Sequence, residues 1–421
     1  MKHDVATIGD LAELSAFDEI IDVRSPAEFA EDHIPGSVNC PVLDDEQRSE
    51  VGTLYKRVSP FDARRIGAAY VAENIADHLR TRFCQRDRSW RPLVVCWRGG
   101  QRSGSLTHIL RRVGWDAQQL EGGYKTYRRL VIASLAEIPR RLSLTVICGA
   151  TGSGKSRILQ AIAARGEQIL DLEELACHKG SVLGVLPNCR QPSQKMFESR
   201  LLISLAAVDP KRRVFVEAES RKIGSLQVPE ALIETMRAGA CLTIEASIDS
   251  RVDFLLRDYD YFLSDPDWLL TRLHALRNLQ GSETILRWAE YTRNACWREL
   301  VRELLQLHYD PLYGRSQKQN YSGFATPSTL TTAVDPDDRR SEHQRNRRTG
   351  QPHLRRLVRA ARRGRHAPHR GAAPWPVADC RPVPPRKPPP ASRAVSPKRA
   401  SPATATGTAD WPADQSAHCR P

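Results

Sequence analysis

The sequence predicts an α/β fold in which two successive parts of the chain each form a parallel β-sheet covered by helices. Short apolar runs that end in a polar residue alternate with amphipathic stretches, which is the pattern of buried parallel strands joined by helices. Two glycine-rich loops, Cys96–Ser103 and Gly149–Ser156, each follow such an apolar run and precede a helical stretch. Since parallel sheets bind ligands beyond the carboxyl ends of their strands, both loops are expected to lie in functional sites.

The first part of the chain begins with a clear strand-to-helix signal. The apolar run 20–24 is followed by Ser25, Pro26 and Glu28, a combination typical of a capped helix start. The elements predicted after it are a strand at 93–95, a helix at 104–113, a closing turn at Gly122-Gly123 and a helical connector at 124–141.

The second part is organised around the second loop. A strand at 142–148 leads directly into it, and a helix at 155–165 follows and stops at Gly166. Further strands are predicted at 168–171, 214–217 and 242–245, with amphipathic helices over 268–307.

Charge separates these two parts from a third. The net charge is +14, but residues 331–421 hold 19 basic and 7 acidic groups, a net of +12, and 15 of the 28 prolines. The predicted organisation is therefore a domain at 8–133, a domain at 134–328 and a disordered Pro/Arg-rich tail at 329–421. An Arg-rich tail suits a nucleic-acid-binding arm. The interpretation we favour is a segment translated in a shifted frame, which replaces C-terminal helices.

The composition favours a cytoplasmic protein. Met1-Lys2-His3-Asp4 lacks the apolar stretch of a secretory signal, and no run of 18 apolar residues predicts a membrane span. The ten cysteines show no metal-ligand or disulfide spacing, so we expect no structural metal and a free thiol at Cys96.

The first loop is predicted to be a nucleophilic site with Cys96 as the catalytic residue. Its backbone N–H groups and the helix that follows favour a thiolate, and Arg98 and Arg102 add positive charge beside Gly99 and Gly100. The spacing of Cys96 and Arg102 also fits a cysteine phosphatase. The loop contains no carboxylate that would serve as the general acid of that reaction.

The second loop matches the pattern G-x-x-x-x-G-K-[ST] of a phosphate-binding loop, or P-loop. Its expected phosphate-binding residues are Gly149, Gly152, Ser153, Gly154, Lys155 and Ser156. Lys155 would neutralise a bound diphosphate, and Ser156 would hold Mg²⁺ if this ion accompanies the ligand. Glu217 and Asp171, each at a predicted strand end, are alternative acids on the metal side.

Several segments around the first loop resemble the rhodanese (sulfurtransferase) domain, which implies a rhodanese-like fold for the first domain. One departure is Asp32, where rhodaneses commonly have Gly. The segments that carry the resemblance are Asp22–Phe29, His33–Asn39 and Leu120–Tyr124.

The order of a rhodanese-like domain and a P-loop NTPase-like domain resembles the tRNA 2-selenouridine synthase family, over about residues 5–325. Further matching segments are Cys40–Asp45, Val51–Lys56, His178–Ser181, Gln191–Gln194, Glu217–Gly224 and His308–Tyr313. The resemblance implies a transferase that replaces sulfur by selenium in wobble 2-thiouridine of tRNA. Geranyl diphosphate and selenophosphate would be its substrates, Cys96 would carry the selenium, and no cofactor would be tightly bound.

Two other classes of function stay open on the residues alone. One is a cysteine phosphatase or sulfurtransferase fused to a small-molecule kinase-like domain, and the other is a sulfur-relay or RNA-binding adaptor without catalysis. The sequence does not specify the oligomeric state or the tRNAs recognised. A series of arginines that either faces tRNA or is an ordinary exposed helical face comprises Arg272, Arg277, Arg287, Arg293, Arg298 and Arg302.

Overall fold

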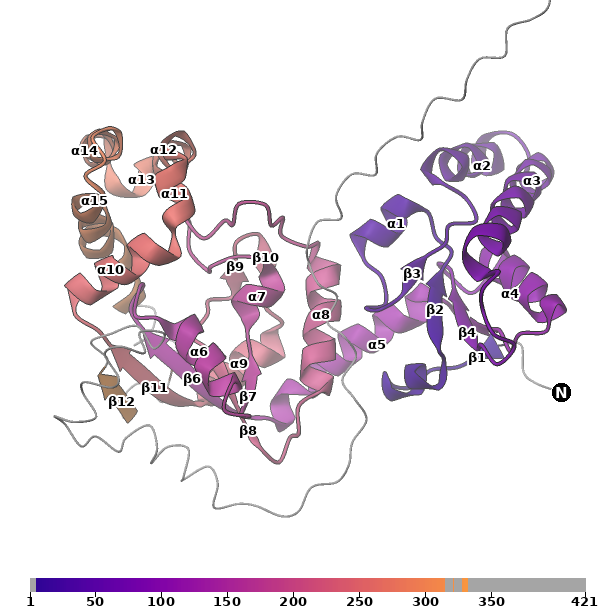
Figure 1. Ribbon diagram of the computed structural model, residues 1–421, viewed down its shortest axis with the longest axis horizontal. Helices are drawn as coiled ribbons and strands as arrows, with labels where there is room; N and C mark the ends of the chain where they lie inside the picture. The colour runs from indigo at the N-terminus through magenta and orange to yellow at the C-terminus, as the bar shows by residue number, and fades with distance from the viewer. Residues whose placement is uncertain (1–4, 315–320, 322–327, 332–421) are drawn as a thin grey trace, which may run out of the picture. The chain divides into compact units, whose positions relative to one another are not determined.

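The computed structural model describes residues 5–314, 321 and 328–331, and shows two five-stranded parallel sheets that follow one another along the chain (Figure 1). The α/β fold class predicted from the sequence is confirmed. No helix among the described residues is long and apolar enough to cross a membrane.

The first sheet has the strand order β1-β5-β4-β2-β3. These strands are β1 (Val5–Ala6), β2 (Glu19–Asp22), β3 (Val38–Asn39), β4 (Pro92–Val95) and β5 (Gln118–Leu120). β4 is buried along its whole length and pairs with β2 on one side and β5 on the other, so its carboxyl end lies at the centre of the sheet edge. Cys96 follows directly, as the sequence predicts.

Five α-helices accompany this sheet: α1 (Pro26–Glu31), α2 (Asp45–Arg57), α3 (Pro60–His78), α4 (Gln101–Val113) and α5 (Tyr124–Glu137). The predicted start of α1 is confirmed, since Ser25 and Glu28 form a capping box. The long α2–α3 pair was not predicted. Its start signals are nevertheless present, because Asp44 and Gln47 form a capping box and Ser59 caps α3 ahead of Pro60.

The second sheet has the order β12-β11-β6-β8-β7, with the phosphate loop after the central strand. Its strands are β6 (Ser143–Gly149), β7 (Gln168–Leu170), β8 (Arg213–Glu217), β11 (Ala240–Glu245) and β12 (Ser328–Thr331), and a short hairpin joins β9 (Lys222–Ile223) to β10 (Leu226–Gln227). The helices around it are α6 (Lys155–Ala163), α7 (Leu172–Ala176), α8 (Gln194–Ala206) and α9 (Glu230–Ala238).

A helical group follows β11 and confirms the helices predicted over 268–307, which form several short segments. It comprises α10 (Ile248–Asp258), α11 (Asp260–Ser264), α12 (Pro266–His274), α13 (Arg277–Gln280), α14 (Ser282–Arg293) and α15 (Trp297–Glu303), which runs on as a π-helical turn at Leu304–Tyr309. Gly281, with φ +79°, separates α13 from α14 in a conformation that disfavours a side chain.

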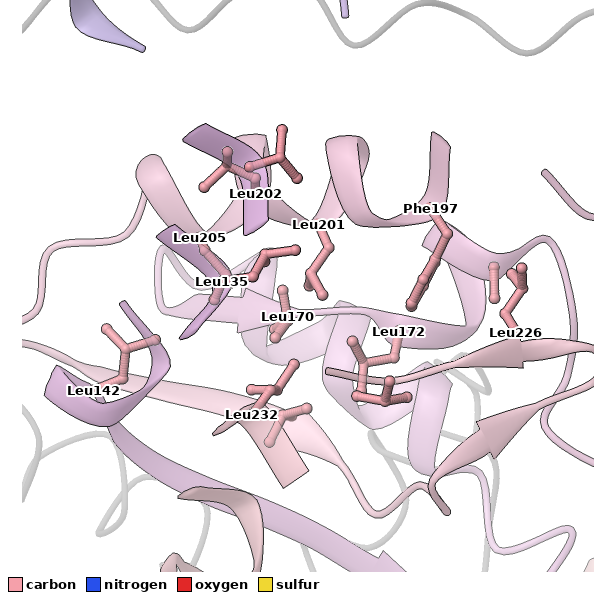
Figure 2. Packing of buried hydrophobic residues seen from close by; sticks show 14 of the residues in the cluster. Leu135, Leu142, Leu170, Leu172, Phe197, Leu201, Leu202, Leu205, Leu226 and Leu232 are labelled. Atoms are coloured by element: carbon pink, nitrogen blue, oxygen red, sulfur yellow. The ribbon is translucent and has the colours of Figure 1, made fainter. Parts of the chain in front are cut away.

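The helix α5 runs from the first sheet into the core of the second. Figure 2 shows its Leu135 beside Leu201 and Leu205 of α8, in a cluster that also contains Leu170 and Leu232. Each of these leucines is at most 4% exposed, so the cluster stabilises the connection by burying apolar surface. The domain boundary predicted at 133/134 falls inside this helix.

The beginning of the predicted disordered tail is wrong by a few residues. Ser328–Thr331 form β12, which pairs in parallel with β11 from Leu242 to Glu245. An unpaired edge of β11 presents free backbone donors and acceptors, and a segment rich in Ser and Thr can pair with them. The rest of the predicted tail, 332–421, lies outside the described residues.

Candidate functional site

The Cys96 sulfur lies in a loop that presents two hydrogen-bond donors to it. The backbone N–H of Gly100 lies 3.2 Å from Cys96 Sγ, and the Ser103 hydroxyl lies 3.0 Å from the same atom. Cys96 is 3% exposed and Ser103 is fully buried in the first turn of α4. Both donors stabilise a thiolate, because hydrogen bonds to a charged acceptor are stronger than those to a neutral one. Sequence reasoning quoted Ser103 in the loop but assigned it no role.

Arg102 does not direct its charge at the sulfur, although the sequence suggested this. Its guanidinium forms an ion pair with Glu28 at 2.7 Å, so the carboxylate offsets its charge. Burial acts to raise the pKa of Glu28, but the hydrogen bond and charge of Arg102 outweigh burial and hold this pKa below its usual value. Arg98 is exposed. The donors at the sulfur are therefore the Gly100 amide and the Ser103 hydroxyl.

Two glycines let the loop and the closing turn approach each other as backbones. A Cβ on Gly123 would lie 2.2 Å from Cys96 O, and one on Gly99 would lie 2.5 Å from Leu120 O. Both residues have positive φ, at +58° and +62°. The Tyr124 N–H donates to Cys96 O at 2.8 Å. The predicted closing turn thus fixes the position of the Cys96 carbonyl group.

Asp32, the departure from the rhodanese pattern, takes part in a buried network behind the loop. Its carboxylate accepts a hydrogen bond of 2.6 Å from the Tyr124 hydroxyl, and its backbone carbonyl accepts one from Arg24. Arg24 is in turn paired with Asp22 and lies over the Tyr124 ring. The φ of Asp32 is −167°, so its backbone does not require glycine. The Tyr124 hydroxyl therefore satisfies one carboxylate oxygen, whereas Asp32 Oδ1 is buried and has no hydrogen-bond partner among the described residues.

The second loop has the strand–loop–helix geometry of a phosphate-binding site. Gly149, Gly152 and Gly154 have positive φ, and a Cβ on Gly149 would lie 2.7 Å from Ile244 O. Ser153 is one of the phosphate-binding residues predicted from the sequence. In this structure the Ser153 amide donates to Ala150 O at 3.1 Å. Ser153 Oγ is buried and has no hydrogen-bond partner among the described residues.

Lys155 and Ser156 face a group of carboxylates. Ser156 Oγ lies 2.9 Å from Glu173 Oε2 and 3.2 Å from Glu217 Oε2, while Lys155 Nζ donates to Gly149 O at 3.0 Å. Burial lowers the pKa of Lys155 against the opposing influence of its acidic neighbours. Burial, together with the neighbouring Glu173, raises the pKa of Glu219 to about 8. This site concentrates negative charge that a cation or bound protons must offset.

The structure distinguishes the two alternative acids. Glu217 contacts Ser156, whereas Asp171 accepts the Glu174 N–H at 2.8 Å and caps α7. Glu173, on that same short helix, reaches Ser156 as well and was missed in the sequence. Its neighbour Glu174 looks the same in a sequence but is exposed, and only the tertiary arrangement separates the two.

An ion pair between Arg251, which is buried, and Asp310, which is partly exposed, lies against the phosphate loop. Arg251 of α10 donates to Thr151 O at 2.8 Å and pairs with both carboxylate oxygens of Asp310. Asp310 belongs to one of the segments that resemble the selenouridine synthase family. From the same segment, the Tyr313 ring lies 4.8 Å from Lys155 Nζ. Residues far apart in the chain therefore fix the loop from both sides.

A cavity of about 640 Å³ opens over the phosphate loop. A second, apolar cavity of about 70 Å³ adjoins it, and both are lined by Thr151, Leu255 and Tyr259. The smaller one continues among the side chains of α11, α12 and α15. The aromatic residues that line the larger one are Phe254, Tyr259, Tyr309, Tyr313 and Tyr321. A ligand with a phosphate end and an apolar end would fit this arrangement.

Comparisons with known proteins agree with this domain order. The family profile described as a rhodanese-like domain matches residues 7–130, and the profile described as the tRNA 2-selenouridine synthase AAA domain matches residues 142–265. A tRNA 2-selenouridine synthase of Nitrosomonas europaea is 34% identical over 264 residues, which are 62% of this chain and 68% of that protein. One of Alcanivorax borkumensis is 32% identical over 327 residues, which cover 70% of this chain and 88% of that protein.

Proposed function

Because this chain belongs to the tRNA 2-selenouridine synthase family, we propose that it transfers selenium to tRNA, replacing the sulfur of a wobble 2-thiouridine. The proposed route has two steps. Geranyl diphosphate first alkylates the sulfur, and selenium from selenophosphate then displaces the geranylated sulfur. The observation that carries this proposal is that one chain contains both a thiol with two hydrogen-bond donors and a phosphate loop beside an apolar cavity.

The phosphate-loop site suits the alkylation step. The sulfur of 2-thiouridine forms a bond to C1 of the geranyl group, the bond from C1 to the diphosphate breaks, and the uracil ring releases its N3 proton. Lys155 and the loop amides would stabilise the charge that develops on the departing diphosphate. The small apolar cavity lined by Leu269 and Leu300 would take the end of the geranyl chain, and Phe254 and Tyr259 of the adjoining larger cavity would pack on the rest and keep water away from C1.

Mg²⁺ fits the same site. Ser156, Glu173 and Glu217 provide oxygen donors, the type that Mg²⁺ prefers, and a bound diphosphate would supply further ones. No group of three His, Cys, Asp or Glu side chains arranged to hold a metal by themselves occurs in the described part of the chain. Such an ion would neutralise diphosphate charge and offset the carboxylates.

The Cys96 site suits the selenium step. S-alkylation makes the sulfur a better leaving group, since it then departs as a thiol. C2 of the uracil exchanges its bond to sulfur for a bond to selenium, and the bond between selenium and phosphorus breaks. Water gives its oxygen to phosphorus, which leaves as phosphate, and its two protons go to N3 of the uracil and to the departing geranyl thiol. The buried Cys96 sulfur, which accepts hydrogen bonds from Gly100 and Ser103, is the soft nucleophile that selenium transfer requires.

The test is mass spectrometry of nucleosides from tRNA of a strain that lacks this gene and carries either the wild-type gene or the Cys96→Ser variant. Wild type should restore 2-selenouridine and the variant should not. Purified protein should also convert thiolated tRNA with geranyl diphosphate and selenophosphate. Hydrolysis of an aryl phosphate that depends on Cys96, without any change in nucleosides, would identify a phosphatase instead.

A further inference from the structure

The turn between α2 and α3 exposes large apolar side chains that a folded protein normally buries. Tyr55 is 57% exposed, Val58 68% and Phe61 71%. The side chains of these three residues form no hydrogen bond or ring contact with any other residue that the structure describes. Single exposed apolar residues are ordinary, but three within one turn indicate a binding surface.

Positive charge surrounds these side chains. Lys56, Arg57, Arg64 and Arg65 are all exposed, and the carboxylate that faces them is Asp62, which pairs with Arg65 at 3.4 Å. Lys56 and Arg57 form no ion pair with an acidic residue in the described part of the chain, so both are available to bind an external anion. We define the α2–α3 tip as Tyr55–Arg65.

The tip is rigid although it is exposed. The N–H groups of Val58 and Ser59 both donate to Leu54 O at 3.0 Å, and Ser59 Oγ accepts from the N–H groups of Phe61 and Asp62. Behind it, Gly67 lets α3 approach Val51 of α2, since an added Cβ would lie 3.3 Å from Val51 Cγ1. A rigid surface loses little entropy when it binds, which favours a recognition role over a solvated loop.

We propose that the α2–α3 tip binds the tRNA substrate, with Lys56 and Arg57 on backbone phosphates and Tyr55 and Phe61 against unpaired bases. Aromatic rings interleaved with cations are the combination that binds unpaired nucleotides. This inference rests on the proposed function, which supplies the tRNA. It also accounts for Tyr55 and Lys56, which belong to the segment Val51–Lys56 that resembles the family but has no part in either loop.

Of the six arginines that the sequence suggested for tRNA binding, three are less suited to bind a phosphate than the tip residues. Arg287 pairs with Glu303, Arg298 with Asp253 and Arg302 with Asp249. A phosphate would have to displace these carboxylates. Three of the six arginines in that series are therefore compensated within the protein, whereas Lys56 and Arg57 of the tip have no acidic partner among the described residues.

The experiment measures binding of the full chain to a purified tRNA that carries wobble 2-thiouridine, as a function of salt. Replacing Lys56 and Arg57 together by Gln should lower the slope of log K against log salt by about 1.8, because each lost phosphate contact removes roughly 0.9. Phe61→Ala should weaken binding roughly fivefold or more without changing the slope, since stacking is not a charge effect. These opposite signatures separate the two contributions.

Matched controls come from exposed residues elsewhere. Replacing Lys211 and Arg213 by Gln removes the same charge from the second sheet, and Leu286→Ala removes an apolar side chain that is 66% exposed. Both should bind tRNA like wild type. Thermal unfolding should show that the tip variants are folded, as expected for exposed positions.

Three results would overturn the inference. If the tip variants bind tRNA like wild type while wild type forms 2-selenouridine, the tip does not bind tRNA and the proposed function stands. If the tip variants change the sedimentation of the protein and not its tRNA affinity, the tip contacts another protein chain. If wild type neither binds nor modifies tRNA, the proposed function fails together with the inference.

Discussion

The Cys96 loop and the phosphate loop share one local architecture and differ in where the charge comes from. Each follows the central strand of a parallel sheet and opens a helix. The first carries the Cys96 thiol within the chain, and Arg102 of the same loop is paired to Glu28. In the second, the proposed anion is the diphosphate of a bound ligand. Without that ligand, Lys155 lies among carboxylates. Under the proposed function, the same backbone arrangement serves a nucleophile that belongs to the chain in one case and the leaving group of a bound substrate in the other.

The comparison predicts that removing the Cys96 sulfur causes the largest loss of activity. Cys96→Ser should lower selenium incorporation on the order of 10³-fold or more, because the hydroxyl is not ionised at neutral pH. Binding of tRNA should be unaffected. Quantification of 2-selenouridine in tRNA checks this, with the exposed Cys84→Ser as control. A near-normal level of 2-selenouridine in the Cys96 variant would show that selenium transfer does not require the Cys96 sulfur.

The second loop should fail at a different step. Lys155→Ala should slow geranylation roughly 10²- to 10³-fold, as for the loss of one electrostatic contact to a departing anion. Selenium transfer to tRNA that is already geranylated should continue. Single-turnover assays of the two steps check this, with Lys211→Ala as control. Normal alkylation by the Lys155 variant would mean that the loop binds another ligand.

Loss of one donor at the sulfur should have an intermediate effect. Ser103→Ala should slow selenium transfer about 10- to 100-fold, the value of a hydrogen bond to a charged group. Alkylation of Cys96 by iodoacetamide should slow in parallel. Ser105→Ala is the control, since that hydroxyl bonds to Gln101 O in the same helix. If Ser103→Ala and Ser105→Ala transfer selenium at the same rate, the Ser103 hydroxyl does not contribute, and the Gly100 amide is the donor that acts on the sulfur.

The carboxylates of the second site should cost stability while the site is empty. Glu219→Gln should raise the free energy of unfolding by about 1 kcal/mol. The folded pKa of Glu219, about 8, exceeds its unfolded value, so its contribution is complete below the unfolded pKa and lost as pH rises through 8. The advantage of Gln should therefore be largest above pH 8 and vanish in acid. Urea titrations across pH check this against Glu245→Gln.

The first loop should show the opposite pH dependence on a smaller scale. The folded pKa of Glu28 is lowered, so its contribution is present above the unfolded pKa and lost as pH falls through the folded pKa. Glu28→Gln should lose up to about 1 kcal/mol at neutral pH and less in acid. The same titrations measure it, with the exposed Glu46→Gln as control. If the loss of unfolding free energy does not change with pH, it comes from the capping box of α1 and not from the ion pair of Glu28 with Arg102.

The sequence predicted what depends on neighbours along the chain. Strand–loop–helix patterns placed Cys96 and Lys155 at strand ends because apolar runs, glycines and caps are local signals. Contacts between distant segments were not predictable in this way. The ion pair of Arg102 with Glu28 and the approach of Glu173 to Ser156 depend on how the elements pack. The α2–α3 pair was missed although its caps are legible, because no apolar periodicity accompanies them in α3.

The contact of Arg251 with Thr151 and Asp310 also has a consequence for the timing of synthesis. While the ribosome is making the chain, the phosphate loop emerges well before Asp310. Until Asp310 arrives, Arg251 lacks the carboxylate that holds it against the Thr151 carbonyl. A nascent or truncated chain that lacks this segment would therefore keep its phosphate-binding sequence without the means to hold it in place. Competence to bind diphosphate would then report that translation had passed this residue.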